Sequence, residues 1–346
     1  MTENNNLQAD SNMQVLTAQE IFEMEAKPKT KKDIVIDYII SFLPIVAGII
    51  SLLEYYFVPN FDGKKNTHVY GIFMLILTAI PLVMFVISFF NKNVHRKLRK
   101  IAPFYAFVLI LLTLYDLATL KTNKLIMPYF PWVDHVFNSA LSDAALLIES
   151  LVSSIKLLAE GYIIGVVLGV ITGILCGYSD KVAYWIQPFL KLIGPIPTTT
   201  WLPVVMVIAA SLHGAAIFVI VIGVWFSVSL ATITGIRSID EAYYEAAQTL
   251  GAKGGELVYR IAIPCALPNI FQGMIQGMSL ACNSLLVAEM LGVDSGLGWY
   301  INWQRGWAEF SKMYAAIVII CLLFFTVNKI LKVASDKLLV WKEGRI

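Results

Sequence analysis

Charged residues are scarce in this 346-residue sequence. Asp, Glu, Lys and Arg make up 14% of the chain, whereas soluble domains average about 25%. The two signs nearly cancel, with 26 basic residues, 24 acidic residues and a formal net charge of +2. This composition argues against a soluble enzyme, a nucleic-acid-binding protein or a disordered chain. Hydrophobic residues account for 58% of the sequence, which indicates a membrane protein.

Patterns typical of catalysis and metal binding are also missing. The four cysteines show no Cys-x-x-Cys spacing, so we expect buried thiols rather than disulfides or a metal site. The four histidines fall in or beside loops and suggest no Ser–His–Asp arrangement. There is no G-x-x-x-x-G-K-[ST] phosphate-binding loop. The first 32 residues hold no apolar core, so no cleavable signal peptide is expected. We therefore expect no enzyme activity, metal or bound cofactor in this chain.

Long apolar runs dominate what is present. About 20 residues are enough for a helix to cross the ~30 Å hydrocarbon core of a bilayer. Continuously apolar runs favour helices over a β-barrel, whose strands alternate in polarity. The sequence therefore predicts an all-α membrane protein with about eight transmembrane helices, at residues 34–58, 69–90, 101–120, 153–177, 184–210, 215–236, 268–291 and 312–333.

The distribution of Lys and Arg predicts the orientation of these spans. With the N-terminus inside, sixteen basic residues fall in inner segments and five in outer ones, while five lie within the spans. Because cytoplasmic loops are enriched in Lys and Arg, both termini are predicted to face the cytoplasm. The predicted divisions are a polar cytoplasmic tail 1–33, transmembrane helices 34–120, an extracytoplasmic loop 121–150 with an amphipathic segment 132–150, a core 151–333 with a cytoplasmic loop 237–266, and a cytoplasmic tail 334–346.

Glycines recur every four residues through the fourth predicted span. On a helix this spacing makes one smooth ridge, which allows close backbone approach between helices in lipid. The ridge is either a static packing surface or a seam that slides during a conformational cycle. Gly273, Gly277 and Ala281 form a shorter ridge of the same kind in the seventh span. The longer ridge, in the fourth predicted span, consists of Gly161, Gly165, Gly169, Gly173 and Gly177.

The cytoplasmic loop 237–266 holds a short amphipathic helix pattern. Asp240 or Ser238 is suited to cap its N-terminus. Gly251 is suited to end the helix, because glycine tolerates the left-handed conformation. Pro264 and Pro268 then mark the entry to the next span. A helix in this position is either an ordinary loop helix or a contact for a cytosolic partner.

The same loop resembles the EAA signature of binding-protein-dependent ABC importer permeases. It carries Glu245-Ala246-Ala247, then Gly251 after three residues, then Ile261-x-Ile263-Pro264 after nine more. The signature has Ile-x-Leu-Pro, so Ile263 is a mild departure. The resemblance extends from Met127 to Trp341 and is similar to the nitrate/sulfonate/taurine/bicarbonate subgroup. It rests further on Gly194-Pro195-Ile196-Pro197, Trp201-Leu202-Pro203, Gly235-Ile236-Arg237-Ser238-Ile239-Asp240, Ala288-Glu289-Met290-Leu291-Gly292 and Ser295-Gly296-Leu297-Gly298.

The resemblance implies a type I importer core preceded by two extra helices, 34–58 and 69–90. It implies a second permease subunit, as a homodimer or a heterodimer, and two cytoplasmic ATPase subunits that hold ATP and Mg. An extracytoplasmic solute-binding protein and a prokaryotic inner membrane are implied as well. The substrate would be a small anion or small polar solute such as a sulfonate, taurine or nitrate. The residues implied to contact the ATPase are Tyr243, Tyr244, Glu245, Ala246, Ala247, Leu250, Gly251, Ile261 and Pro264.

Polar residues inside spans are candidates for the transport path. Gln272, Gln276 and Asn283 share one helical face with Ser279 and either line a pore or bond between helices. Prolines interrupt the fifth span beside three threonines, and broken helices are tolerated where they line a cavity. Glu289 is a gate or a structural partner. Lys191 is explained by snorkelling or by a salt bridge. The candidates for the path are Thr198, Thr199, Thr200, Gln272, Gln276, Asn283 and Glu289.

Two other functions stay open at this level. Related permease subgroups handle vitamins or their precursors, so an uncharged heterocycle is an alternative substrate. An ion-coupled secondary transporter is a more distant alternative, and it would need an internal repeat and an ion site at the midplane. The sequence shows no convincing repeat and no central pair of acids, which favours the importer.

Overall fold

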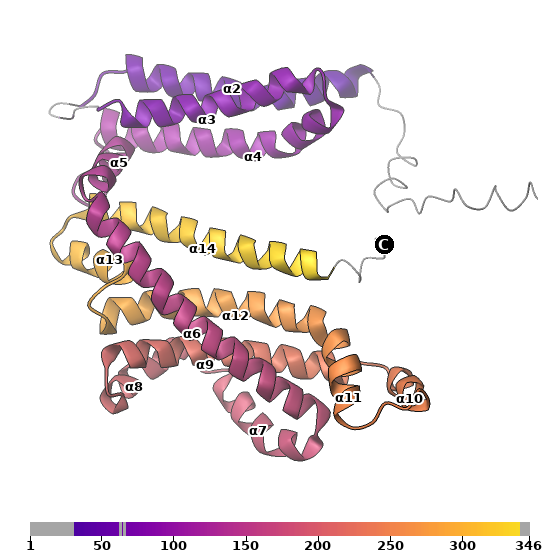
Figure 1. The fold of residues 1–346 in the computed structure, drawn as a ribbon. Coiled ribbons are helices and arrows are strands. Elements are labelled where there is room, and N and C mark those ends of the chain that lie inside the picture. Colours follow the sequence, from indigo (N-terminus) through magenta and orange to yellow (C-terminus); the bar gives the residue numbers. More distant parts are fainter. Residues whose placement is uncertain (1–30, 62–63, 65–66, 340–346) are drawn as a thin grey trace, which may run out of the picture. The chain divides into compact units, whose positions relative to one another are not determined.

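The structure is a computed structural model that describes residues 31–61, 64 and 67–339. Most of the predicted tail 1–33, and residues 340–346 of the predicted tail 334–346, lie outside the described residues. Helices and connecting turns form the described part, which contains no strand. The elements in Figure 1 are α2 (Lys31–Phe57), α3 (Val69–Ser88), α4 (Lys92–Asp116), the π-helical η2 (Leu117–Lys121), α5 (Val133–Ser142), α6 (Ala144–Tyr178), α7 (Asp180–Ile193), the 3-10 turn η3 (Thr198–Trp201), α8 (Leu202–Ile208), α9 (Leu212–Arg237), α10 (Glu241–Thr249), α11 (Gly255–Leu257), the π-helical η4 (Val258–Ala262), α12 (Ile263–Gly292), α13 (Leu297–Gly306) and α14 (Phe310–Leu338).

Seven stretches of helix in the described residues are long and apolar enough to cross a membrane, and α7 with η3–α8 forms a further, bent pair. The predicted all-α membrane fold is therefore confirmed. The boundaries differ in two places. The fourth span begins at Ala144 rather than at 153, and the helix that contains the seventh span already begins at Gly255. Neither extension is polar overall, but each contains charged residues, Glu149 in the first and Arg260 in the second, which interrupt the apolar run in the sequence.

The chain divides into two compact units. The first comprises residues up to Asn60 and Gly71–Leu117, and the second comprises Phe61–Tyr70 and the chain from Ala118 onward. Within the first unit, α2 and α4 are tied by an Arg99–Asp37 ion pair of 2.8 Å. A buried hydrogen bond between the Ser51 and Thr113 hydroxyls lies farther along the same pair of helices. The extra helix α2 is thus held on α4 by polar contacts at two levels.

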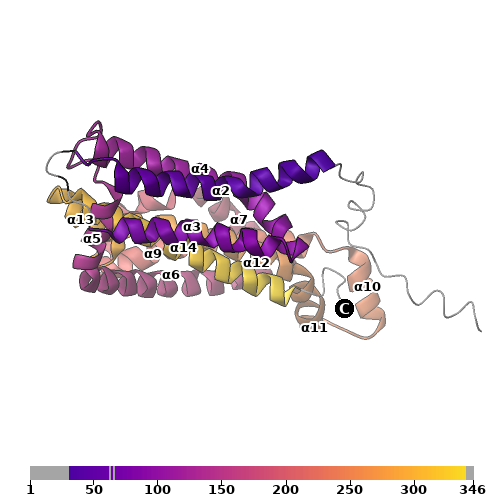
Figure 2. The same cartoon turned by 90° about the horizontal axis from the view of Figure 1, so that it is seen from above.

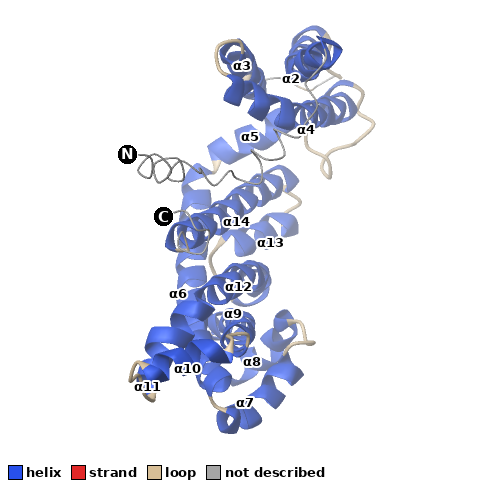
Figure 3. Cartoon of the chain, turned by 90° about the vertical axis from the view of Figure 1, so that its right-hand side faces the viewer, coloured by secondary structure: helices blue, strands red, loops and turns tan. Residues whose placement is uncertain are grey.

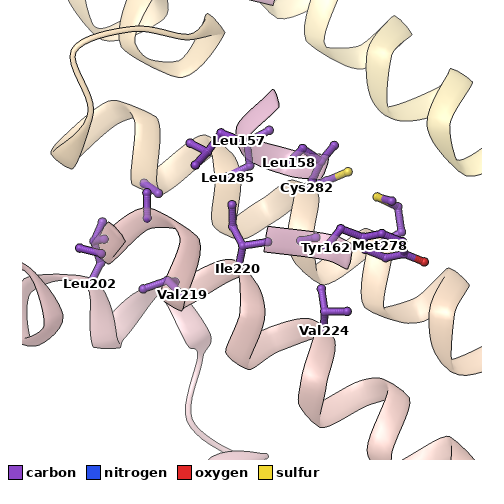
Figure 4. Close-up of a cluster of buried hydrophobic side chains, with 14 of the residues drawn as sticks. Leu157, Leu158, Tyr162, Leu202, Val219, Ile220, Val224, Met278, Cys282 and Leu285 are labelled. Atoms are coloured by element: carbon purple, nitrogen blue, oxygen red, sulfur yellow. The ribbon is translucent and has the colours of Figure 1, made fainter. Parts of the chain in front are cut away.

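In the second unit, α9 packs between two helices that turn glycines toward it (Figure 3). The α6 glycines face α9 at a constant sequence offset, from Gly161 on Ile220 to Gly177 on Ile236. A constant offset means that α6 and α9 run parallel and in register. On another side of α9, Gly277 of α12 faces Val224. Figure 4 shows Ile220 and Val224 within the cluster that these helices share with Met278 and Cys282 of α12.

The parallel pairing of α6 and α9 shows that the bent pair crosses the bundle. Tyr178 ends α6 at one end of the unit, whereas Leu212 begins α9 at the other. The segment between them must return along the bundle, over a length of roughly 24 Å between the levels of Gly177 and Gly161 alone. The α7 and η3–α8 helices cover this path with a bend of 92°. The number of crossings is therefore eight, as predicted, and the fifth is broken in the middle.

The short segment that leads into α3 belongs to the second unit, where it contacts α5. Asp134 of α5 is fully buried, and its carboxylate accepts hydrogen bonds from the Thr67 N–H at 2.7 Å and the Tyr70 N–H at 3.0 Å. It thereby satisfies backbone donors at the start of α3. The predicted amphipathic segment 132–150 is broken at Asp143, between α5 and α6. The Asp143 carboxylate accepts a hydrogen bond from the Tyr300 hydroxyl at 2.6 Å, which holds the break in place.

Candidate coupling surface and transport path

The α10 helix has defined ends. The Asp240 side chain accepts a hydrogen bond from the Ala242 N–H at 3.0 Å and caps the N-terminus. Gly251 follows the helix with a φ of +93°, in the left-handed region. Its N–H bonds the Gln248 carbonyl, and the Ala252 N–H bonds the Ala247 carbonyl, which is the Schellman pattern. The predicted capping by Asp240 and Gly251 is thus present in the structure.

The predicted coupling residues divide between two faces. Tyr243 and Leu250 are 61% and 89% exposed, and Glu245, Ala246 and Gly251 are exposed with them. Tyr244 instead packs on the chain's own cluster of Ile236, Ala262, Ala266 and Ile270. Burial there raises the pKa of its phenol, with smaller contributions from Cys265 and Tyr178. Ala247 is buried, and Ile261 and Pro264 are half-buried.

Because the predicted coupling residues divide between an exposed and a packed face, only some of them lie on the exposed surface. Tyr244 and Ala247 pack toward the bundle, so they are left out of the exposed group, and their predicted contact with an ATPase stays a prediction. We define the exposed group Tyr243, Glu245, Ala246, Leu250 and Gly251 as the α10 surface. Tyr259, in η4, is 76% exposed and was not singled out in the sequence. The helical spacing of residues before Pro264 is the sequence signal that could have identified Tyr259.

The α10 surface lies at one end of the unit. Figures 1 and 2 show α10 and α11 projecting beyond the ends of α9 and α12. At the same end, Arg237 of α9 forms a 2.8 Å ion pair with Asp180 of α7. Lys181, Lys253 and Arg260 belong to segments at this end. These are the same basic residues that predicted a cytoplasmic position for this loop in the sequence, so the cytoplasmic side stays a prediction.

The break in the fifth crossing is held by specific contacts. After Pro197 the chain forms the 3-10 turn η3 over Thr198–Trp201. The Thr198 hydroxyl bonds the Ser284 hydroxyl of α12 at 2.8 Å. Thr198 and Thr199 are half-buried, whereas Thr200 is exposed. Ser284 was not among the predicted residues, because only the fold brings it to the break.

One face of α12 carries the polar side chains predicted to share it. Gln272, Gln276, Ser279 and Asn283 are all exposed, whereas Gly273 and Gly277 face α9. Amide groups do not face hydrocarbon without partners, because each unsatisfied group costs several kcal/mol there. This polar face therefore requires water or another protein chain against it.

Glu289 does not line an open path. It is 1% exposed, and its carboxylate accepts a hydrogen bond from the Gly298 N–H at 2.8 Å. Nearby, the Ser154 hydroxyl of α6 accepts a hydrogen bond from the Leu297 N–H at 2.8 Å. Gly296 has a φ of +115° and leaves no room for a Cβ beside Glu289. Glu289 thus joins α12 to the loop before α13, which agrees with the structural alternative, and a role as a gate stays a prediction.

Eight helical crossings, a capped helix exposed at one end and a polar face on α12 define a multi-pass membrane transport subunit. Residues 165–339 match the family model described as binding-protein-dependent transport system inner membrane component. The chain belongs to this family. It is an ABC importer permease, and its relatives place it in the nitrate/sulfonate/taurine/bicarbonate subgroup predicted from its motifs.

Three relatives illustrate this similarity. An ABC transporter permease protein of Methanocaldococcus jannaschii is 30% identical over 210 residues, which are 60% of this chain and 78% of that protein. The aliphatic sulfonates transport permease protein SsuC of Bacillus subtilis is 30% identical over 191 residues, covering 55% and 69% of the two chains. The taurine transport system permease protein TauC of Escherichia coli is 25% identical over 231 residues, covering 64% and 84%.

Proposed function

We propose that this permease couples the import of a small anion to a separate ATPase through the α10 surface. The observation that carries the proposal is the exposure of Leu250 and Tyr243, at 89% and 61%, on a helix that is itself capped and anchored. Large apolar side chains on a rigid cytoplasmic helix fit pockets of a protein partner. Glu245 adds a charge that can pair with a basic group on that partner.

The proposed assembly contains two permease subunits and two cytoplasmic ATPase subunits in a prokaryotic inner membrane. ATP and Mg belong to the ATPase subunits. A second permease, as a homodimer or heterodimer, covers the polar face of α12 and encloses a water-filled path with it. The exposed amides of Gln272 and Gln276 support this arrangement. An extracytoplasmic solute-binding protein delivers the solute to the opposite end.

A small organic anion is the substrate class that we propose. The named functions of the sulfonate and taurine permeases support it, because these relatives align with more than half of this chain. Sulfonates carry a fixed negative charge on a small body, so the path needs hydrogen-bond donors and positive charge. The amide groups on α12 and the hydroxyls at the break supply such donors.

The coupling role is tested by Leu250→Asp. Leu250 is 89% exposed, so the substitution should leave the fold intact while placing a charge on the proposed contact. We expect the ATPase to be lost on co-purification and ATP-driven uptake to fall at least about tenfold. The matched control is Leu338→Asp, at an exposed leucine of α14 predicted to lie on the same side of the membrane. Retained ATPase and unaltered uptake in Leu250→Asp would contradict the docking role.

A further inference from the structure

Lys191 lies deep in the crossing rather than near its end. The Asp180–Arg237 ion pair fixes the start of α7 at the cytoplasmic end of α9. A Cβ on Gly194 would lie 2.7 Å from the ring of Phe226, which fixes the end of α7 at the middle of α9. Lys191 follows Asp180 by eleven residues, a rise of about 16 Å along a helix. Measured along α7 from Asp180, this length is about half of the ~30 Å hydrocarbon core.

The Lys191 ammonium has no counter-charge at this depth. The side chain is exposed, and it makes no ion pair or hydrogen bond with any residue that the structure describes. Of the two explanations left open for Lys191, the salt bridge is absent among the described residues, and snorkelling of its four-carbon stem stays a prediction. A charge at this depth requires water, a counter-ion or a ligand.

A groove of about 380 Å³ opens beside Lys191, between α7 and α9. Its lining is largely apolar, with Phe226, Leu230 and Ile233 on the α9 side, and Gln187 and Lys191 are the polar residues among those that line it. Gly194 lies at the same groove and begins the segment that leads to the threonines of the break. One positive charge beside an apolar wall is complementary to a small molecule with an anionic head and an apolar body.

We propose that Lys191 and this groove form an anion-binding site of the transport path. The Lys191 ammonium binds the anionic head of the solute, Gln187 donates a further hydrogen bond, and the apolar body packs along Phe226, Leu230 and Ile233. This site deepens the proposed function and rests on it, because it assigns the substrate class to specific residues. Attraction to the dipole at the C-terminal end of α7 contributes to the local field, but it leaves the ammonium without a bonded partner.

The first test measures uptake by the assembled complex. The permease is reconstituted in proteoliposomes with its ATPase and solute-binding protein, and ATP-driven uptake of radiolabelled ethanesulfonate and taurine is followed. We expect Lys191→Gln to lower uptake at least about tenfold, because it removes a charge-assisted bond. Lys191→Arg should stay within about threefold of the wild-type rate. The matched control is Lys181→Gln, at an exposed lysine near the start of α7, and it should not change uptake.

The outcomes separate this site from the proposed function. Wild-type uptake by Lys191→Gln would overturn the anion site while leaving the importer in place. If Lys191→Gln assembles poorly and uptake falls only in proportion to the amount of assembled complex, the ammonium belongs to a structural ion pair and the site is overturned. ATP hydrolysis by the wild-type complex without uptake of either probe would exclude the substrate class and the site together. Absence of ATP-dependent uptake or hydrolysis in a complete wild-type complex would count against the importer itself.

A second measurement reports on the groove without transport. Lys191→Cys is introduced into a chain whose four native cysteines are replaced, and membranes are treated with the anionic thiol reagent methanethiosulfonate ethylsulfonate. A water-filled site should be labelled, whereas Phe325→Cys, on an exposed apolar position of α14, should not be. Labelling of Lys191→Cys by membrane-permeant N-ethylmaleimide alone would place the position against lipid acyl chains or a lipid phosphate and overturn the proposal.

Discussion

A methyl group added to the α6 ridge tests the packing of α9. In Gly165→Ala the new Cβ would lie 2.6 Å from the Val224 Cβ and 3.1 Å from the Val221 carbonyl oxygen. Ordinary contacts begin at 3.4 Å, so the helices must separate by about 0.8 Å at this level. Overpacking of this kind costs about 1–3 kcal/mol, which exceeds the gain of at most about 1 kcal/mol in helix propensity. We expect a net destabilisation of about 1–2 kcal/mol.

The matched control places the same methyl group on the other side of the same valine. In Gly277→Ala the Cβ would lie 3.4 Å from the Val224 Cγ1, an ordinary contact. Thermal unfolding of the purified complex in detergent should show a midpoint lowered by several degrees for Gly165→Ala. The midpoint for Gly277→Ala should be unchanged or raised. Equal midpoints for the two variants would refute the assignment of α6 and α9 as a close-packed parallel pair.

Two further predictions follow from the other sites. Gln276→Leu should lower uptake about tenfold if its amide lines the path, because a hydrogen bond to a charged group is worth roughly 1.5–3 kcal/mol. The control Gln276→Asn should keep most of the wild-type rate. Wild-type kinetics for Gln276→Leu would contradict a path-lining position. Asp134→Ala should destabilise the protein by about 3 kcal/mol in thermal unfolding, because it leaves the Thr67 and Tyr70 N–H groups without their acceptor. An unchanged unfolding midpoint would count against this anchoring.

The sequence predicted the features that depend on local chemistry. Apolar length alone identified the eight crossings, because lipid forces each one to satisfy its own backbone hydrogen bonds. Asp240 and Gly251 marked the ends of α10 correctly, since capping depends on the residues at the helix ends. The four-residue spacing of glycines identified the ridge on α6, although it gave no information on which helix packs there.

Features that depend on distant contacts were out of reach. Tyr244 and Tyr243 are adjacent in the sequence and equally suited to a contact surface, and only the position of α9 and α12 turns Tyr244 inward. Glu289 is an acidic residue within a span, as a path residue would be, but the loop at Gly296–Gly298 folds over its carboxylate. The position of Lys191 along α9 follows from the packing of Gly194 on Phe226, which the sequence does not show. In each case the missing information is tertiary position rather than residue chemistry.

The position of α9 connects the cytoplasmic surface to the break. Its C-terminus continues into α10 through Ser238–Asp240, with the Ser238 N–H still bonded to the Thr234 carbonyl. Glycines of α6 and α12 hold its sides closely, so a force on α10 moves the three helices together rather than bending one of them. At its middle, Gly223 packs against Thr198 of η3. The segment from Gly194 to Trp201 has a 92° bend and two prolines, which have no N–H to bond the preceding turn. Bending there therefore breaks fewer backbone hydrogen bonds than bending a continuous helix. A load on α10 is therefore expected to change the geometry of the break, where the anion site and the threonines meet.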